Sequence, residues 1–243
     1  HTAGFPAFKQ YYLMDIEAED ILADICNTEL VYDPGTKTIY SDLGLILLGA
    51  VIESVAGMPL DTFVAKHLFE PLGMSTSFYN PPDDKRKRIV PTEIVSGYRS
   101  GLIHGEVHDE NAHKLGGVAG HAGLFSTASE LARFAQMMLN NGQYGKKRIF
   151  KEKTVRQFTQ RAMVDTSSSR CLGWDSPSGN ASGGVYQSGN SYGHTGYTGT
   201  SLWIDPDHDL FVILLTNAVH PDRSYKDPTY FDWRQRIHSE VYE

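Results

Sequence analysis

The order of the expected elements predicts an α+β fold, in which an antiparallel sheet follows a helical subdomain. Two apolar runs late in the chain, 202–204 and 210–215, flank the turn residues 205–209. Apolar runs separated by a turn predict an antiparallel hairpin that is buried on at least one face. Earlier segments carry their apolar residues at helical spacing instead. Helices in the middle and strands late in the chain therefore favour an antiparallel sheet with helices around it.

The first part of the chain predicts helices with clear ends. The expected helices lie at residues 15–29, 43–56 and 60–69. Ser41 or Asp42 serves as the N-cap of the second helix, and Gly57 stops it. The third helix is expected to end before Pro71, because the residue before a proline disfavours helical geometry.

The middle of the chain lacks a sustained period, and we expect loops and short strands over residues 81–120. Thr127-Ala128-Ser129-Glu130 is a capping box and predicts a helix start. Asn140-Asn141-Gly142 ends that helix. The remaining expected segments are a short helix at 151–161, a Ser/Gly-rich connection at 166–190 and a terminal helix at 230–242.

The composition is that of an ordinary globular protein, with 40% apolar and 21% charged residues among 243. A net charge of −7 argues against nucleic acid as a partner and against an anionic membrane surface. The longest apolar run, 43–52, is too short to span a bilayer. Cys26 and Cys171 do not make a disulfide framework, and whether they pair stays open.

Two segments combine loop geometry with reactive side chains. Gly193-His194-Thr195-Gly196-Tyr197-Thr198-Gly199 precedes the hairpin, and glycine in a strand marks either a close approach of backbone or ligand, or a bulged edge strand. Tyr40-Ser41-Asp42 lies where a loop becomes a helix. A tyrosine near cations acts as a general base there if its pKa falls, whereas spacing alone favours a packed tyrosine before a capping Ser-Asp pair.

These segments resemble the serine β-lactamase/penicillin-binding-protein superfamily, in its class C-like branch. Tyr40-Ser41-Asp42 resembles the tyrosine motif of that branch, and His194-Thr195-Gly196 resembles its third motif, usually Lys-Thr-Gly or His-Thr-Gly. The further resembling segments are His1-Thr2-Ala3-Gly4-Phe5-Pro6, Pro71-Leu72-Gly73-Met74 and the glycine-rich residues 116–127. They follow the order of the family and cover nearly the whole chain.

The resemblance implies a β-lactamase/transpeptidase-like antiparallel sheet flanked by helices, and acyl transfer through a serine. Tyr40 would shuttle the proton between nucleophile and leaving group. His194 would replace the cationic lysine that tunes Tyr40 and attracts a substrate carboxylate. Thr195 would hydrogen-bond that carboxylate, with Gly196 beside it, and the backbone N–H of Tyr197 would supply half of the oxyanion hole.

The nucleophile of this family belongs to a Ser-x-x-Lys helix, but no serine or threonine of this chain has a lysine three positions later. The chain also starts with His1 and has no basic-then-apolar leader. We therefore expect an N-terminally truncated domain that is inactive alone and whose nucleophile lies upstream. The absent strands would leave an open sheet edge, which predicts self-association.

The third position of the tyrosine motif is asparagine in the family and Asp42 here. A carboxylate donates to a substrate carbonyl only when it is protonated. This disfavours β-lactam hydrolysis and favours a substrate that offers a donor, such as an amine. His108, Asp109 and His121 are expected as further substrate contacts. The histidines between residues 104 and 113 match no standard zinc spacing, so we expect no metal and no cofactor.

Val107-His108-Asp109-Glu110-Asn111-Ala112 and Gly120-His121-Ala122-Gly123 look closest to domains encoded beside, or fused after, a family 3 β-N-acetylglucosaminidase. Such members are associated with cell-wall turnover. The resemblance therefore implies a muropeptide or other small-molecule substrate, a fused upstream glycoside hydrolase domain and a periplasmic or cell-envelope location. One domain is expected over 1–243, with a helical subdomain at about 9–165 and a sheet with the C-terminal helix at about 170–243.

Together these observations predict a fragment of a serine hydrolase that acts on peptidoglycan-derived amide or peptide bonds. One alternative is a non-catalytic module that binds muropeptides or a partner. Another is β-lactamase, D-aminopeptidase or esterase activity, which the same fold hosts. A Ser-x-x-Lys upstream of this chain would separate an enzyme from a binding module.

Overall fold

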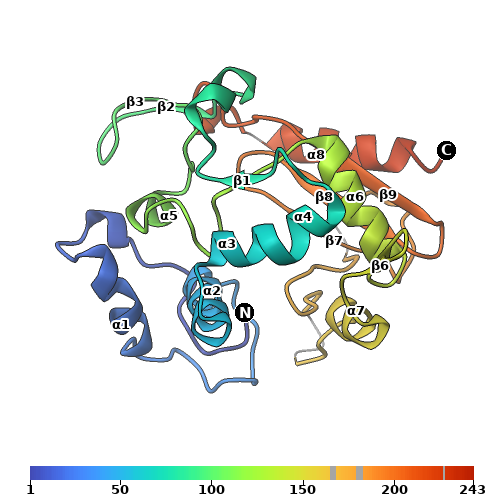
Figure 1. The fold of residues 1–243 in the computed structure, drawn as a ribbon, viewed down its shortest axis with the longest axis horizontal. Coiled ribbons are helices and arrows are strands. Elements are labelled where there is room, and N and C mark those ends of the chain that lie inside the picture. The colour runs from blue at the N-terminus through green and yellow to red at the C-terminus, as the bar shows by residue number, and fades with distance from the viewer. Residues whose placement is uncertain (165–167, 179–182, 227) are drawn as a thin grey trace. The chain divides into compact units, whose positions relative to one another are not determined.

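The computed structural model describes residues 1–164, 168–178, 183–226 and 228–243, which form two compact units (Figure 1). Unit 1 comprises His1–Glu70, Ser75–Phe125 and Val164–Ser168. Unit 2 comprises Pro71–Met74, Ser126–Met163 and Ser169–Glu243. Within the described residues no single helix meets the length and hydropathy needed to cross a membrane; only the bent pair Asp42–Ala56 and Leu60–Leu72 meets them jointly.

Unit 1 consists of short helices and two-stranded antiparallel ladders. Its helices are α1 (Ile21–Cys26), α2 (Asp42–Ala56), α3 (Leu60–Val64) and α5 (Glu110–Lys114), with 3-10 turns at Tyr11–Leu13, Ala18–Asp20 and Asp83–Arg88 and a π-helical turn at Ala65–Phe69. The ladders pair β1 (Phe78–Tyr79) with β4 (Leu124–Phe125), and β2 (Glu93–Val95) with β3 (Gly101–Ile103). One of its core clusters contains Tyr11, Ile21, Ile25, Leu43 and Ile46.

Helix α2 has the ends that the sequence predicts. Ser41 is its N-cap: the hydroxyl accepts from the N–H of Gly44 at 3.4 Å and donates to the carbonyl of Pro6 at 2.8 Å. Gly57 follows the helix with a φ of 65°, in the left-handed region that glycine adopts without strain. Of the two predicted N-caps, Ser41 is therefore the one used.

Two other predicted helices differ from the structure. Residues 15–29 contain only the 3-10 turn Ala18–Asp20 and α1, and like charges at helical spacing, such as Asp15 and Glu19, disfavour a longer helix. The helix from residue 60 does not end before Pro71, since it continues as α4 (Glu70–Leu72). A π-helical turn precedes Pro71, and in it the N–H of Glu70 donates to the carbonyl of Ala65, five residues earlier.

Unit 2 contains the predicted hairpin within a three-stranded sheet. The strand order is β7 (Tyr192–Thr195), β8 (Ser201–Asp205), β9 (Leu210–Leu214), and both pairings are antiparallel. The helices are α6 (Ala128–Leu139), α7 (Glu152–Thr159) and α8 (Pro228–Glu240), with a 3-10 turn at Arg223–Tyr225 and a ladder of β5 (Gln143–Tyr144) with β6 (Lys147–Arg148). The predicted capping box is confirmed, because the Thr127 hydroxyl accepts from the N–H of Glu130 at 3.4 Å.

Helices cover both faces of the sheet in unit 2 (Figure 1). Trp174 stacks on Phe134 of α6 and meets the edge of Tyr192, which places α6 on the Tyr192 face. On the other face, His238 of α8 contacts the Ser201 hydroxyl at 2.9 Å. Coverage of both faces explains why consecutive residues of β8 are buried.

The division into units differs from the predicted subdomain boundary near residue 165. Helix α6 packs against β8 and β9, so it belongs with the sheet of unit 2 rather than with the earlier helices. A single domain over 1–243 stays a prediction. Cys26 and Cys171 are both free thiols.

A buried carboxylate connects three segments at the end of β8. Asp205 is 2% exposed and accepts from the N–H of Ser188 at 2.8 Å and from its hydroxyl at 2.6 Å. It also accepts from Nδ1 of His208 and from the Tyr242 hydroxyl, each at 2.9 Å. Burial alone would raise the pKa of Asp205, but these hydrogen bonds outweigh it and lower the pKa to about 2.

We predict that Asp205→Asn lowers the free energy of unfolding at neutral pH by about 2 kcal/mol, because the charged acceptor of these donors is lost. A carboxyl whose pKa is lowered in the folded state stabilises the fold above its unfolded pKa of 3.8, and that stabilisation disappears as the pH falls towards about 2. Urea unfolding at a series of pH values checks this: the difference between wild type and variant should shrink over that range.

Asp209→Asn is the matched control on the same turn. Asp209 has a φ of 52°, which asparagine also tolerates, and it is exposed. Its substitution should change stability by less than about 0.5 kcal/mol. Equal stability of the two variants at neutral pH would contradict the role given to Asp205.

Candidate functional site

The tyrosine motif lies at the start of α2 in unit 1. Tyr40 directly precedes the N-cap Ser41 and is 45% exposed, and its ring lies 4.2 Å from the ring of His1. Nδ1 of His1 accepts from the N–H of Ser41 at 3.1 Å. The cap thus holds the backbone of the motif while the tyrosine ring reaches solvent, as a proton-transfer group at a substrate would require.

Asp42 belongs to an acidic cluster with a buried histidine. Nε2 of His121 lies 2.9 Å from Oδ1 of Asp109, and the His121 side chain is 5% exposed. Gly120 brings His121 close to α2, because a Cβ on Gly120 would lie only 2.1 Å from the carbonyl oxygen of Leu45. The structure therefore brings together three of the predicted substrate contacts.

The pKa values of the two carboxyl groups in this cluster are shifted in opposite directions. Burial raises the pKa of Asp42, the charge of His121 opposes that rise, and the charge of Asp109 adds to it. Burial would also raise the pKa of Asp109, but its bonds with His121 and with the N–H of Ala112 leave that pKa lowered. Asp42 is therefore the carboxyl of the pair that takes up a proton first.

His108, a predicted substrate contact, has a different place. Its side chain is 8% exposed, and Nε2 lies 2.7 Å from Oε2 of Glu93, which is itself 2% exposed on β2. This buried pair joins β2 to the segment that leads into α5. His108 thus packs within unit 1, and its role as a substrate contact stays a prediction.

The third motif lies on β7, at the start of the sheet of unit 2. Gly193 pairs with Trp203, and a Cβ on Gly193 would lie 2.4 Å from Cδ2 of that tryptophan. The glycine is there because the indole takes the space, which agrees with the close-approach interpretation. His194 pairs with Leu202 and lies on the same face of the sheet as Tyr192.

His194 contacts a cation that the motif does not contain. Nη1 of Arg170 lies 3.0 Å from Nε2 of His194, and Nδ1 lies 2.8 Å from the carbonyl oxygen of Thr195. Burial lowers the pKa of His194; the Thr195 carbonyl opposes this and the charge of Arg170 adds to it. That His194 replaces a cationic lysine stays a prediction; the structure places a second cationic group, the guanidinium of Arg170, beside it.

The rest of the third motif forms the turn between β7 and β8. The N–H of Gly196 donates to the carbonyl of Thr200 at 2.8 Å, which closes the turn. Tyr197 is 57% exposed, its carbonyl accepts from Nζ of Lys226, and that ammonium lies 4.3 Å from the centre of its ring. Lys226, in the segment before α8, thus contacts the turn that carries the predicted oxyanion N–H.

Sequence reasoning missed Arg170, Lys226 and Glu93. None lies in a recognised motif, and each meets its partner only through folding. Helix α5 was also missed, although Asp109 is its N-cap and Glu110 follows in its first turn. An acidic cap before an acidic first turn is a local indication of a helix start that the sequence did contain.

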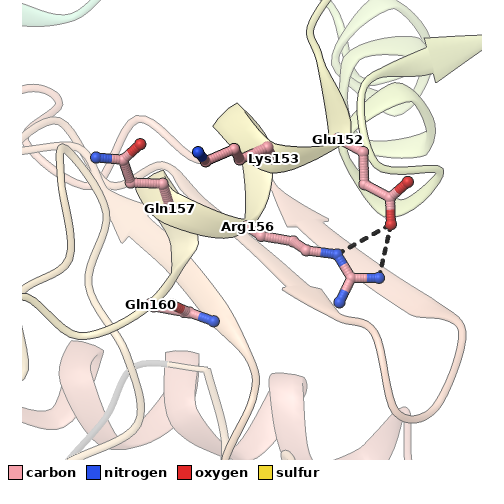
Figure 2. Close-up of a pocket in the computed structure, with 5 residues that line it drawn as sticks. All are labelled: Glu152, Lys153, Arg156, Gln157 and Gln160. Carbon is pink, nitrogen blue, oxygen red and sulfur yellow. Dashed lines mark hydrogen bonds and ion pairs between the residues drawn. The ribbon is translucent and has the colours of Figure 1, made fainter.

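A hollow on α7 is not part of either motif. Figure 2 shows its five lining side chains, Glu152, Lys153, Arg156, Gln157 and Gln160, and the ion pair between Glu152 and Arg156, at 2.7 Å. These are exposed residues of α7 and its C-cap, and none is a serine, threonine or cysteine. Within the described residues, no three His, Cys, Asp or Glu side chains gather as metal ligands would.

Comparison with known sequences gives a family match over residues 1–235, to the model described as beta-lactamase. Proteins named putative D-alanyl-D-alanine carboxypeptidase from Salmonella newport and Salmonella choleraesuis are each 41% identical to this chain over an alignment of 244 residues. The alignment covers 90% of this chain and 56% of each relative. The chain thus spans little more than half the length of these curated relatives.

Solved structures share the fold at low identity. A penicillin-binding protein homologue from Caulobacter crescentus has a TM-score of 0.70 at 16% identity, over 100% of this chain and 68% of that one. A β-lactamase from Mycobacterium bovis has a TM-score of 0.65 at 20% identity, over 99% and 70%. The family match, the relatives and the shared fold lead to one conclusion: the chain belongs to the beta-lactamase family, within the β-lactamase/transpeptidase-like superfamily of serine hydrolases.

Proposed function

We propose that this chain is the substrate-handling part of a serine hydrolase that cleaves peptidoglycan-derived peptide or amide bonds through an acyl-enzyme. One motif residue in each unit supports the proposal. Tyr40 is exposed at the N-terminus of α2 in unit 1, and His194 lies on β7 in unit 2, next to the guanidinium of Arg170. A proton-transfer tyrosine and a fixed cation are what cleavage before a free carboxylate requires.

The proposed substrate class is a peptide that ends in D-alanyl-D-alanine or a related muropeptide. The 41% identical relatives carry the name D-alanyl-D-alanine carboxypeptidase. A solved structure from Yersinia pestis, described as a β-lactamase/D-alanine carboxypeptidase, shares the fold with a TM-score of 0.65. The free carboxylate of such a peptide would suit the charge of Arg170.

The nucleophile is proposed to lie on a Ser-x-x-Lys segment outside these 243 residues, so that the chain alone is inactive. This is supported by the absence of any serine or threonine with a lysine three positions later. The fusion to, or location beside, a family 3 β-N-acetylglucosaminidase, the cell-envelope location and self-association along the sheet edge are proposals of the same kind. Cell fractionation and sedimentation of the full-length protein test the last two.

We predict that Tyr40→Phe in the full-length protein lowers kcat by about a hundredfold or more, with little change in KM, because only proton transfer is lost. The assay is release of D-alanine from a peptide that ends in D-alanyl-D-alanine. Tyr225→Phe is the matched control, since Tyr225 is 68% exposed and outside both motifs. An unchanged kcat for Tyr40→Phe would show that the base is another group. Binding without release by the wild type would favour the non-catalytic module.

A second prediction concerns Asp42, where the family has asparagine. Asp42→Asn supplies an amide that donates to a carbonyl at every pH, so acylation by a penicillin should become about tenfold faster at pH 7. Because burial raises the pKa of Asp42, the wild type should acylate faster as the pH falls and the carboxyl takes up a proton. Stopped-flow acylation rates between pH 5 and about 8 check both. A slower variant would contradict the proposed contact with the substrate carbonyl.

A further inference from the structure

Arg170 lies far from the third motif in sequence but beside it in the fold. Arg170 and Asp175 form an antiparallel bridge, and Asp175 bridges to Gly193 on the outer edge of β7. Two backbone hydrogen bonds make the second bridge, from the N–H of Asp175 to Gly193 at 2.8 Å and in return at 2.9 Å. The short turn that carries Arg170 is thus an added edge of the sheet, so the guanidinium is placed by backbone pairing.

The contact between Arg170 and His194 determines where the imidazole carries its proton. A guanidinium has only donors and stays protonated in proteins. With Nη1 of Arg170 at 3.0 Å, Nε2 of His194 must therefore accept. The ring proton is then on Nδ1, which donates to the carbonyl of Thr195 at 2.8 Å. Both ring nitrogens are satisfied only in this neutral form.

Asp175 fixes the guanidinium from its other side. Oδ2 of Asp175 lies 3.5 Å from Nη2 of Arg170, and the two side chains are 24% and 25% exposed. Among the described residues, Arg170 and Asp175 both act on the pKa of His194, with opposite signs. Asp175 also pairs with Gly193 and with Arg170 through its backbone. The same residue therefore positions the backbone of Arg170 by pairing and its guanidinium by an ion pair.

We propose that Arg170 is a positioning residue for the third motif: its guanidinium donates to Nε2 of His194 and holds the ring as the neutral tautomer with its proton on Nδ1. The role in turnover rests on the proposed function, but the state of the ring does not. The consequence is that the positive charge of this site is on an arginine, which does not lose its proton in the working pH range. A histidine in that place would titrate in that range.

The test is NMR of the full-length protein labelled with [15N]histidine, with His194 assigned by the loss of its signal in His194→Gln. The wild type at pH 7 should show protonated Nδ1 and unprotonated Nε2. Arg170→Gln should give a mixture of tautomers and a raised pKa of His194, whereas Arg170→Lys, which still donates a charged hydrogen bond, should keep Nε2 unprotonated. Arg156→Gln on α7 is the control and should leave His194 unchanged.

The pH dependence of kcat/KM separates positioning from support of the fold. In Arg170→Gln the acidic limb should move to higher pH and Arg170→Lys should restore it, whereas a purely structural defect lowers the rate by the same factor at every pH. A charged His194 or an Nε2–H tautomer in the wild type at pH 7 would overturn the proposal even if Arg170→Gln fails to fold. Absent hydrolysis would refute the proposed function alone, because the NMR result still decides the state of His194.

Discussion

The close pairing of β7 with β8 is the constraint on which the third motif depends. At Gly193 the space that a side chain needs is taken by the indole of Trp203 and the carbonyl of Leu202, 2.4 Å and 2.5 Å from a Cβ position. The same residue pairs on its other edge with Asp175. The same glycine thus takes part in both pairings, and the second pairing brings Arg170 to His194.

A glycine in close contact with a neighbouring backbone also occurs near the tyrosine motif of unit 1. Gly120 lies so close to the backbone of α2 that a Cβ would be 2.1 Å from the Leu45 carbonyl. This contact brings His121 close to Asp42 in the first turn of α2 and to Asp109, the N-cap of α5. In each unit a residue placed near such a glycine lies beside a motif residue: burial raises the pKa of Asp42 against the effect of His121, and burial and Arg170 both lower the pKa of His194.

The sequence predicted those features that depend on neighbours in the chain. Ser41, Gly57 and Thr127 act as helix ends because capping is local chemistry, and the hairpin follows from two apolar runs and a turn. Charge partners are not local: Arg170 comes from a stretch expected to be a loop and is 24 positions from His194. The five residues of α5 are too few for a periodic pattern. The sequence therefore contains no indication of Arg170, although it predicted the motif that Arg170 contacts.

Covalent labelling tests the central claim, that this chain handles substrate for a serine outside it. The full-length protein and the 243-residue chain would each be treated with a fluorophosphonate and weighed intact, and the labelled peptide would then be sequenced. The account predicts one adduct on the full-length protein, at the serine of a Ser-x-x-Lys segment, and none on the shorter chain. Labelling of a serine within these residues, or of neither protein, would contradict it.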